Sequence, residues 1–135
     1  MGLGFVCADL LSNGIQVALP LSEHLPFDCI AISDSGELKR VSVKYRAAVN
    51  GALEISRRSV WSDRHGSHVK THPRGAYDAF AVYCPDTAKC YYILENEIIG
   101  TYLKLRLCSP KNSQKKGVHS VTLFTNPKRL FDPVA

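Results

Sequence analysis

An aspartate and a lysine stand at a spacing that could place a carboxylate beside an ammonium group. Asp28 lies at the start of an apolar segment, residues 27–33, and Lys44 lies in a second alternating segment, residues 38–47. Asp34-Ser35-Gly36 between them is typical of a tight turn, so the two segments are expected to pair as a hairpin. A carboxylate suits a hard cation such as Mg²⁺, and a neighbouring lysine can activate water and stabilise a pentavalent phosphate. The spacing alone equally allows an Asp28 that caps a turn and a Lys44 that is only a solvated charge.

The elements that must position these two side chains follow from the rest of the pattern. Residues 5–11 have apolar side chains at helical spacing and end at Ser12-Asn13-Gly14, a typical helix C-terminus. Alternation predicts a strand over 15–19, and it places Val41 and Val43 on one face of the 38–47 strand, with Ser42 and Lys44 on the other. Residues 53–58 are predicted to add a third strand to the hairpin and form a meander, joined to the second strand through Asn50-Gly51. The remaining predictions are a polar loop at 59–76, strands at 79–84, 90–94 and 101–107, a basic loop at 109–117, and a strand or a helix at 118–125.

Length and composition predict a single α/β domain that spans residues 1–135. Apolar residues make up 45% of the chain, which is enough for a core and argues against disorder. No apolar run approaches the roughly 18 residues of a membrane-spanning helix, and the N-terminus lacks the features of a signal peptide. Five cysteines, an odd number, fit a reducing compartment. We therefore expect a cytoplasmic protein without a membrane partner.

The charges are distributed unevenly, and this predicts a nucleic-acid partner. Residues 1–38 contain five acids and no Lys or Arg, so residues 39–135 hold all 17 basic residues against seven acids, a charge of +10. One basic segment around the single tryptophan and another near the C-terminus suit contacts with DNA phosphates and base edges, although either could be merely solvated. The DNA-binding candidates are Arg57, Arg58, Arg64, Lys70, Lys111, Lys115 and Lys116.

Several stretches, taken in order, resemble the PD-(D/E)XK nuclease superfamily and, within it, the small bacterial homing endonucleases associated with group I introns. The resemblance implies a restriction-endonuclease-like core, in which an N-terminal helix precedes a mixed β-sheet with flanking α elements. It also implies a Mg²⁺- or Mn²⁺-dependent, site-specific endodeoxyribonuclease that acts on double-stranded DNA as a homodimer or homotetramer, associated with the bacterial nucleoid. The stretches that carry it are 4–11, 14–20, 26–28, 41–44, 77–85, 105–107 and 110–118.

The resemblance also assigns roles within the predicted site. Asp28 matches the metal-binding aspartate, and Lys44 matches the lysine that positions the attacking water. Val43 holds the position whose backbone carbonyl faces the metal. Ser42 stands where the superfamily has Asp or Glu and the intron-associated branch can have Gln.

A glutamate that these nucleases carry on the first helix has no counterpart here, since its nearest match falls at about Phe5. Asp9, one turn later on the same helical face, could supply a metal-binding carboxylate instead. Glu54 on a later strand is a second candidate for the same catalytic role.

The departures from the family pattern keep other functions open. A serine at position 42 and the missing helix glutamate favour a catalytically weakened or inactive, nuclease-derived DNA-binding module. A Holliday-junction-resolvase-like enzyme would share the same core. An RNA-binding protein is a further, weaker possibility.

Overall fold

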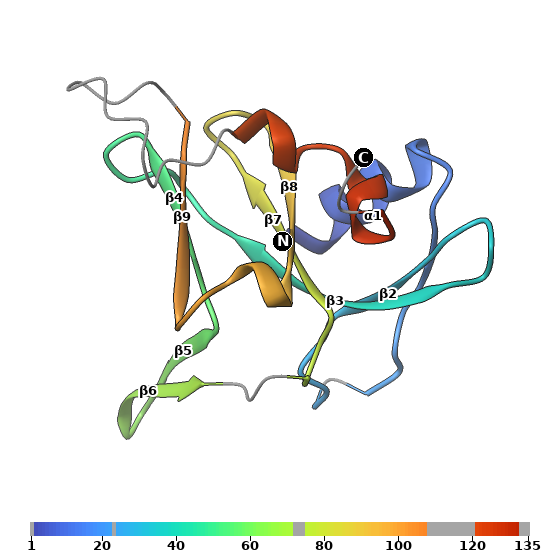
Figure 1. Cartoon of the computed structure of the whole chain (residues 1–135). Helices are drawn as coiled ribbons and strands as arrows, with labels where there is room; N and C mark the ends of the chain where they lie inside the picture. Colours follow the sequence, from blue (N-terminus) through green and yellow to red (C-terminus); the bar gives the residue numbers. More distant parts are fainter. Residues whose placement is uncertain (1, 23, 72–74, 108–120, 133–135) are drawn as a thin grey trace.

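The structure, a computed structural model, describes residues 2–22, 24–71, 75–107 and 121–132 (Figure 1). One helix comes first and strands follow, so the predicted α/β class, with a restriction-endonuclease-like mixed sheet, is confirmed. The elements are α1 (Gly2–Ser12), β1 (Gln16–Ala18), β2 (Cys29–Ile32), β3 (Leu38–Tyr45), β4 (Ala52–Ser56), β5 (Arg58–Asp63), β6 (Gly66–Thr71), β7 (Ala79–Cys84), β8 (Lys89–Leu94), β9 (Tyr102–Arg106) and three 3₁₀ turns, η1 (Glu95–Glu97), η2 (Val121–Phe124) and η3 (Pro127–Leu130).

A five-stranded sheet in the order β1-β2-β3-β7-β8 forms the centre of the molecule. The predicted hairpin exists: β2 and β3 pair antiparallel, with Cys29 opposite Val41, around a turn in which Gly36 has a φ of 88°. The strand β3 then pairs in parallel with β7, which brings Ser42 opposite Phe80. The sheet is therefore mixed, and β3 is hydrogen-bonded on both edges.

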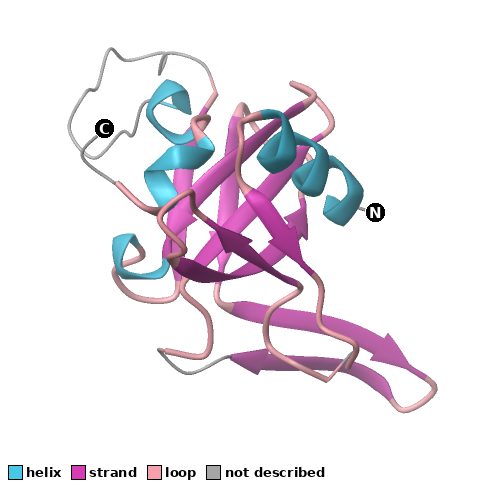
Figure 2. Ribbon diagram, turned by 90° about the vertical axis from the view of Figure 1, so that its right-hand side faces the viewer, coloured by secondary structure: helices cyan, strands magenta, loops and turns pink. Residues whose placement is uncertain are grey.

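The helix α1 covers one face of this sheet (Figure 2). Its buried side chains, Val6 and Leu10, pack in a cluster with Val41 of β3 and the small alanines of β7. The helix ends where the chain turns through Gly14, at a φ of 78°, which is the termination that the sequence predicts.

The other face of the sheet is covered by β4 and β9, which form a separate antiparallel pair. Leu53, Ile55 and Leu105 from this pair are fully buried in a cluster with Phe80. The prediction that β4 is the third strand of the β2–β3 meander is therefore wrong. The free edge of β3 is taken by β7, so the chain leaves the sheet after β3 and reverses at Asn50-Gly51, where both residues have positive φ as a tight hairpin turn requires.

Residues 59–76 do not form the structureless loop that their polarity predicts. Most of them form a two-stranded ribbon, β5 and β6, which pairs from Arg58 opposite Thr71 to Asp63 opposite Gly66. Figures 1 and 2 show this ribbon extending away from the rest of the molecule. The inner-edge backbone groups of the two strands pair with each other. The sequence of the segment is polar and lacks regular hydrophobic alternation, so that signal could not reveal the ribbon.

The C-terminal 3₁₀ turns are held against β8 by a buried ion pair. Arg129 is 6% exposed; its guanidinium donates to both carboxylate oxygens of Glu97, at 2.6 and 2.8 Å, and to the carbonyl of Tyr92 at 2.8 Å. It also lies over the ring of Phe124, 4.5 Å from the centroid. Arg129 belongs to the basic C-terminal segment of the sequence, yet these contacts make it a structural residue. The basic segment 109–117 and residues 118–120 lie outside the described residues, and residues 121–124 form η2.

Replacing Arg129 by Met should lower the free energy of unfolding by about 3 kcal/mol, because the half-buried Glu97 carboxylate would lose the positive charge that balances it. Urea unfolding followed by circular dichroism at pH 7 measures this change. The neighbouring Lys128→Met is the matched control; Lys128 is exposed, and its loss should change stability by less than about 0.5 kcal/mol. Equal effects of the two substitutions would contradict the structural role of Arg129.

Candidate active site

The start of β2 fixes the carboxylate of Asp28 against the middle of β3. The backbone N–H of Asp28 donates to the carbonyl of Val41 at 2.9 Å, which continues the β2–β3 pairing by one residue. Its Oδ2 in turn accepts a hydrogen bond from the backbone N–H of Val43 at 2.7 Å. One backbone and one side-chain contact thus hold Asp28 beside the Ser42-Val43-Lys44 segment, and its Oδ1 has no hydrogen-bond partner among the described residues.

Lys44 lies on the face of β3 opposite to α1. Val41 and Val43 pack toward the helix, whereas the ammonium of Lys44 lies over the ring of Phe80, 5.3 Å from its centroid. Burial lowers the pKa of Lys44 to about 8, and the charge of Arg46 acts in the same direction. The negative charge of Asp28 acts in the opposite direction and partly restores the pKa of Lys44.

Ser42 and Val43 complete the segment between the two charged residues. Ser42 is 9% exposed and lies opposite Phe80 in the parallel register, so it offers a neutral hydroxyl in a nearly dry position. Behind this segment, the first turn of α1 is in close contact, since a Cβ added to Gly2 would lie 3.3 Å from the carbonyl oxygen of Lys44. Residues 42–44 are therefore held by Asp28 and β7 at their edges and by the start of the helix on one face.

The groups around Asp28 are oxygen donors, which fits a hard divalent cation. The candidate ligands for such a cation are Oδ1 of Asp28, the carbonyl oxygen of Val43 and the hydroxyl oxygen of Ser42. Mg²⁺ is commonly held by one or two carboxylates together with water and substrate phosphate, so one carboxylate is compatible with binding. Asp28 also lines a hollow of about 230 Å³ with Leu3, Phe27 and Ser22, which leaves room beside its carboxylate.

The structure does not gather the other predicted carboxylates around Asp28. Asp9 lies between α1 and β8, where its Oδ2 accepts a hydrogen bond from the hydroxyl of Tyr92 at 2.5 Å. Burial, with the Asp9 hydrogen bond next, raises the pKa of Tyr92 far above its usual value, so this phenol remains a donor. Over the described ranges, no group of three or more His, Cys, Asp or Glu side chains is placed to hold a metal ion.

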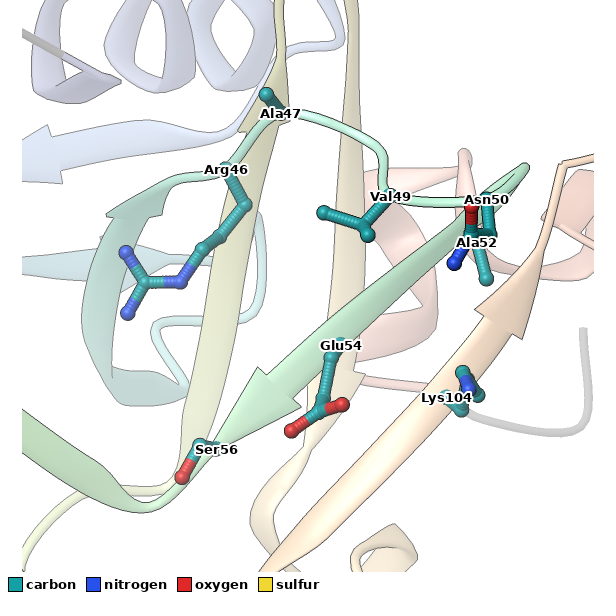
Figure 3. Close-up of a pocket in the computed structure, with 8 residues that line it drawn as sticks. All are labelled: Arg46, Ala47, Val49, Asn50, Ala52, Glu54, Ser56 and Lys104. Atoms are coloured by element: carbon teal, nitrogen blue, oxygen red, sulfur yellow. The ribbon is translucent and has the colours of Figure 1, made fainter.

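Glu54 lies on the outward side of β4, opposite Lys104 of β9. Figure 3 shows it in a hollow of about 490 Å³, whose other wall is the segment that leaves β3. Arg46 extends into this hollow from that segment, and Asn50 and Ser56 also contribute to its lining. Leu53 and Ile55, the neighbours of Glu54, point the opposite way into the core.

The DNA-binding candidates have very different surroundings. Arg57 is 4% exposed, and its guanidinium donates to the carboxylate and carbonyl of Glu95, to the carbonyl of Ile98 at 2.6 Å and to that of Gly100 at 2.9 Å. These internal acceptors occupy the group, so Arg57 anchors the root of the ribbon instead of facing DNA. Arg64 is exposed at the ribbon's turn. Arg58 and Lys70 lie on the two ribbon strands, and Lys111, Lys115 and Lys116 fall outside the described residues.

One carboxylate near the site, Asp78, is absent from the sequence predictions. It precedes β7 and accepts from the backbone N–H of Arg40 at 2.7 Å and from its guanidinium at 3.2 Å. Burial raises the pKa of Asp78, but the Arg40 hydrogen bonds outweigh it and leave the pKa below its usual value. Arg40 also donates to the carbonyls of Gly75 and Ala76. The one signal in the sequence was an aspartate directly before a buried strand, and nothing there identifies a partner 38 residues away.

The environment of Lys44 predicts how its ammonium titrates. In the absence of divalent metal, the ¹³Cε resonance of Lys44 should titrate with a midpoint near pH 8. Asp28→Asn should lower this midpoint, because it removes the charge that favours the ammonium, and Arg46→Met should raise it. NMR of ¹³C-lysine-labelled protein, with Lys44→Met to assign the resonance, measures all three. A wild-type midpoint at pH 10 or above would contradict the desolvation of the half-buried Lys44 ammonium.

In the described part of the chain, no helix has both the length and the apolar character needed to cross a membrane.

Comparisons with known proteins agree on the fold. A solved structure entitled "The structure of a bacterial homing endonuclease: I-Ssp6803I" is similar, with a TM-score of 0.64 and 18% sequence identity, over 85% of this chain and 78% of that one. A comparison with curated protein sequences found no match. A family model described as PD-(D/E)XK endonuclease matches residues 4–127, and this match, which covers nearly the whole chain, makes the protein a member of the PD-(D/E)XK endonuclease family.

Proposed function

We propose that this chain is a Mg²⁺- or Mn²⁺-dependent endodeoxyribonuclease that cuts double-stranded DNA at a specific site. The observation that carries the proposal is the joint placement of Asp28 and Lys44: the carboxylate of Asp28 is held by the backbone N–H of Val43, and the half-buried Lys44 is the next residue on β3. Membership of the endonuclease family supplies the reaction class. The similar structure's title names a homing endonuclease, which supports the site-specific role by analogy of fold.

The chain's own residues divide the chemistry of phosphodiester hydrolysis. Asp28 and the Val43 carbonyl would hold the cation, which when bound neutralises phosphate charge and makes a bound water more acidic. Lys44 orients the attacking water and stabilises the developing charge on the phosphate with its ammonium. At the pKa of about 8 this ammonium can also release a proton near neutral pH, so the same Nζ can exchange a proton with the water. Ser42 contributes a neutral hydroxyl at the same edge.

The DNA would be held by the ribbon and by the basic C-terminal segment. A two-stranded ribbon fits the major groove, and Arg58, Arg64 and Lys70 belong to this one. Lys111, Lys115 and Lys116 add phosphate contacts in the proposal, and two or four copies around a symmetry axis would lengthen the recognised site. Such an enzyme would act at the bacterial nucleoid in the cytoplasm.

The main rival is a DNA-binding module that has lost its chemistry. Two observations favour this alternative. Ser42 is neutral and nearly buried. Among the described residues, Asp9 contacts Tyr92 and Glu54 lines a different hollow, so neither lies beside Asp28. It predicts sequence-specific binding without products under any divalent metal.

Cleavage assays separate these two functions. A plasmid library with randomised inserts should be cut by the wild type with Mg²⁺ or Mn²⁺ and left intact with EDTA. Asp28→Asn and Lys44→Met should each reduce the rate at least about 10³-fold, within the range expected for loss of a metal ligand or of a proton-transfer group. Binding without cleavage by the wild type under both metals would establish the module, and cleavage that persists in both variants would reject the assigned site. A four-way junction and a linear duplex as parallel substrates test the resolvase-like alternative.

Replacing the serine at position 42 by the acid of the family pattern should increase the affinity of the site for a divalent metal. Ser42→Asp should lower the Mn²⁺ concentration for half-maximal cleavage about 10-fold, because a second carboxylate would stand beside Asp28. Ser42→Ala is the control of similar size and should not lower it. Calorimetric titration with Mn²⁺ in the absence of DNA gives an independent readout. Weaker metal binding by a folded Ser42→Asp variant would show that position 42 does not face the metal.

A further inference from the structure

The hollow that contains Glu54 adjoins the end of the catalytic strand. Arg46, which extends into it, follows Lys44 by two residues, so their Cα atoms lie about 7 Å apart along an extended chain. Successive nucleotides of one strand of DNA are about 3.4 Å apart along the helix axis. A duplex bound with its scissile phosphate at Lys44 would therefore present the next few nucleotides to this hollow.

The outward side of the β4–β9 pair is an exposed and well-supported surface. Glu54 and Lys104 are both exposed and lie directly opposite each other, while Leu53, Ile55 and Leu105 fasten the other side of the same strands in the core. Since the strands cannot rotate without losing that core, the Cα–Cβ bonds of Glu54 and Lys104 keep their outward direction. A rigid two-stranded surface of this kind can enter a major groove.

The charged side chains that line the hollow suit different chemical groups of DNA. Arg46 and Lys104 are exposed cations and suit phosphates. Glu54 is an exposed carboxylate for which the described structure records no ion pair within 4 Å, and a phosphate would repel it. The DNA groups that a carboxylate can bind are the exocyclic amino groups of bases. In the major groove, the N4 amino group of cytosine is a donor that a carboxylate can approach without meeting an acceptor on the same base.

We propose that Glu54 is a specificity-determining residue that accepts a hydrogen bond from the N4 amino group of a cytosine close to the cleaved bond, while Arg46 and Lys104 hold the adjoining phosphates. The proposal rests on the proposed function, because it places the scissile phosphate at Asp28 and Lys44. It gives Glu54 a different role from the metal-binding one expected from sequence. Asn50, at the tip of the tight turn, lines the same hollow and limits the space for the base.

Selection of bound duplexes from a randomised pool, in EDTA so that nothing is cut, tests this role. The wild type should select a motif with one position at which cytosine is preferred about 10-fold or more. Glu54→Ala should lose the preference at that position alone, and Glu54→Gln should shift it toward adenine, the base that an amide side chain pairs with. Lys104→Met is the matched control from the opposite strand: it should keep the motif, weaken binding to all sequences and reduce the salt slope by about one.

Each other outcome has a definite meaning. A motif that is unchanged in Glu54→Ala, or a wild type that selects no cytosine, overturns the proposal. If the motif is unchanged and Glu54→Ala loses both cleavage and Mn²⁺ binding, Glu54 is a metal ligand instead. Plasmid cleavage by the wild type is measured separately, so a chain that selects the motif without cutting contradicts the nuclease function and still supports base reading by Glu54.

Discussion

The strand β3 is hydrogen-bonded on both edges, to β2 in an antiparallel register and to β7 in a parallel one, and the rest of the structure follows from this constraint. A parallel neighbour requires a long crossover, and here the crossover contains β4, β5 and β6. The same constraint means that β4 finds no free edge on β3. It pairs with β9 instead and covers the face of the sheet opposite to α1. The candidate catalytic segment, residues 42–44, thus occupies the central strand of the five-stranded sheet.

This restraint defines what the site can and cannot do. The Val43 N–H fixes one oxygen of Asp28 and leaves the other for a ligand, and the apolar surroundings of Lys44 lower its pKa to about 8. Both features come from backbone pairing and burial, so they persist without the second acid of the family pattern. A divalent cation held by a single carboxylate generally completes its coordination with water and phosphate oxygens.

Much of this arrangement could be predicted from the sequence, because it depends on local rules. Alternation places Lys44 opposite to Val41 and Val43, and the Asp34-Ser35-Gly36 turn brings Asp28 beside them. Contacts between distant residues were not predictable. Arg57 resembles a DNA-binding arginine in sequence, yet carbonyls some 40 residues later take its hydrogen bonds. The parallel pairing of β3 with β7, and the Arg40–Asp78 contact that accompanies it, likewise leave no periodic signal.

The ribbon is fastened at both roots, by Arg57 where it departs from β4 and by Arg40 where the chain returns at Gly75 and Ala76. Between these fasteners the backbone of β5 and β6 pairs only with itself. A longer ribbon would leave both root contacts and the pairing of residues 42–44 in place, and closing the longer loop would cost only slightly more. The two root contacts therefore separate the length of the ribbon from the geometry of β3, the strand whose Val43 N–H holds the carboxylate of Asp28.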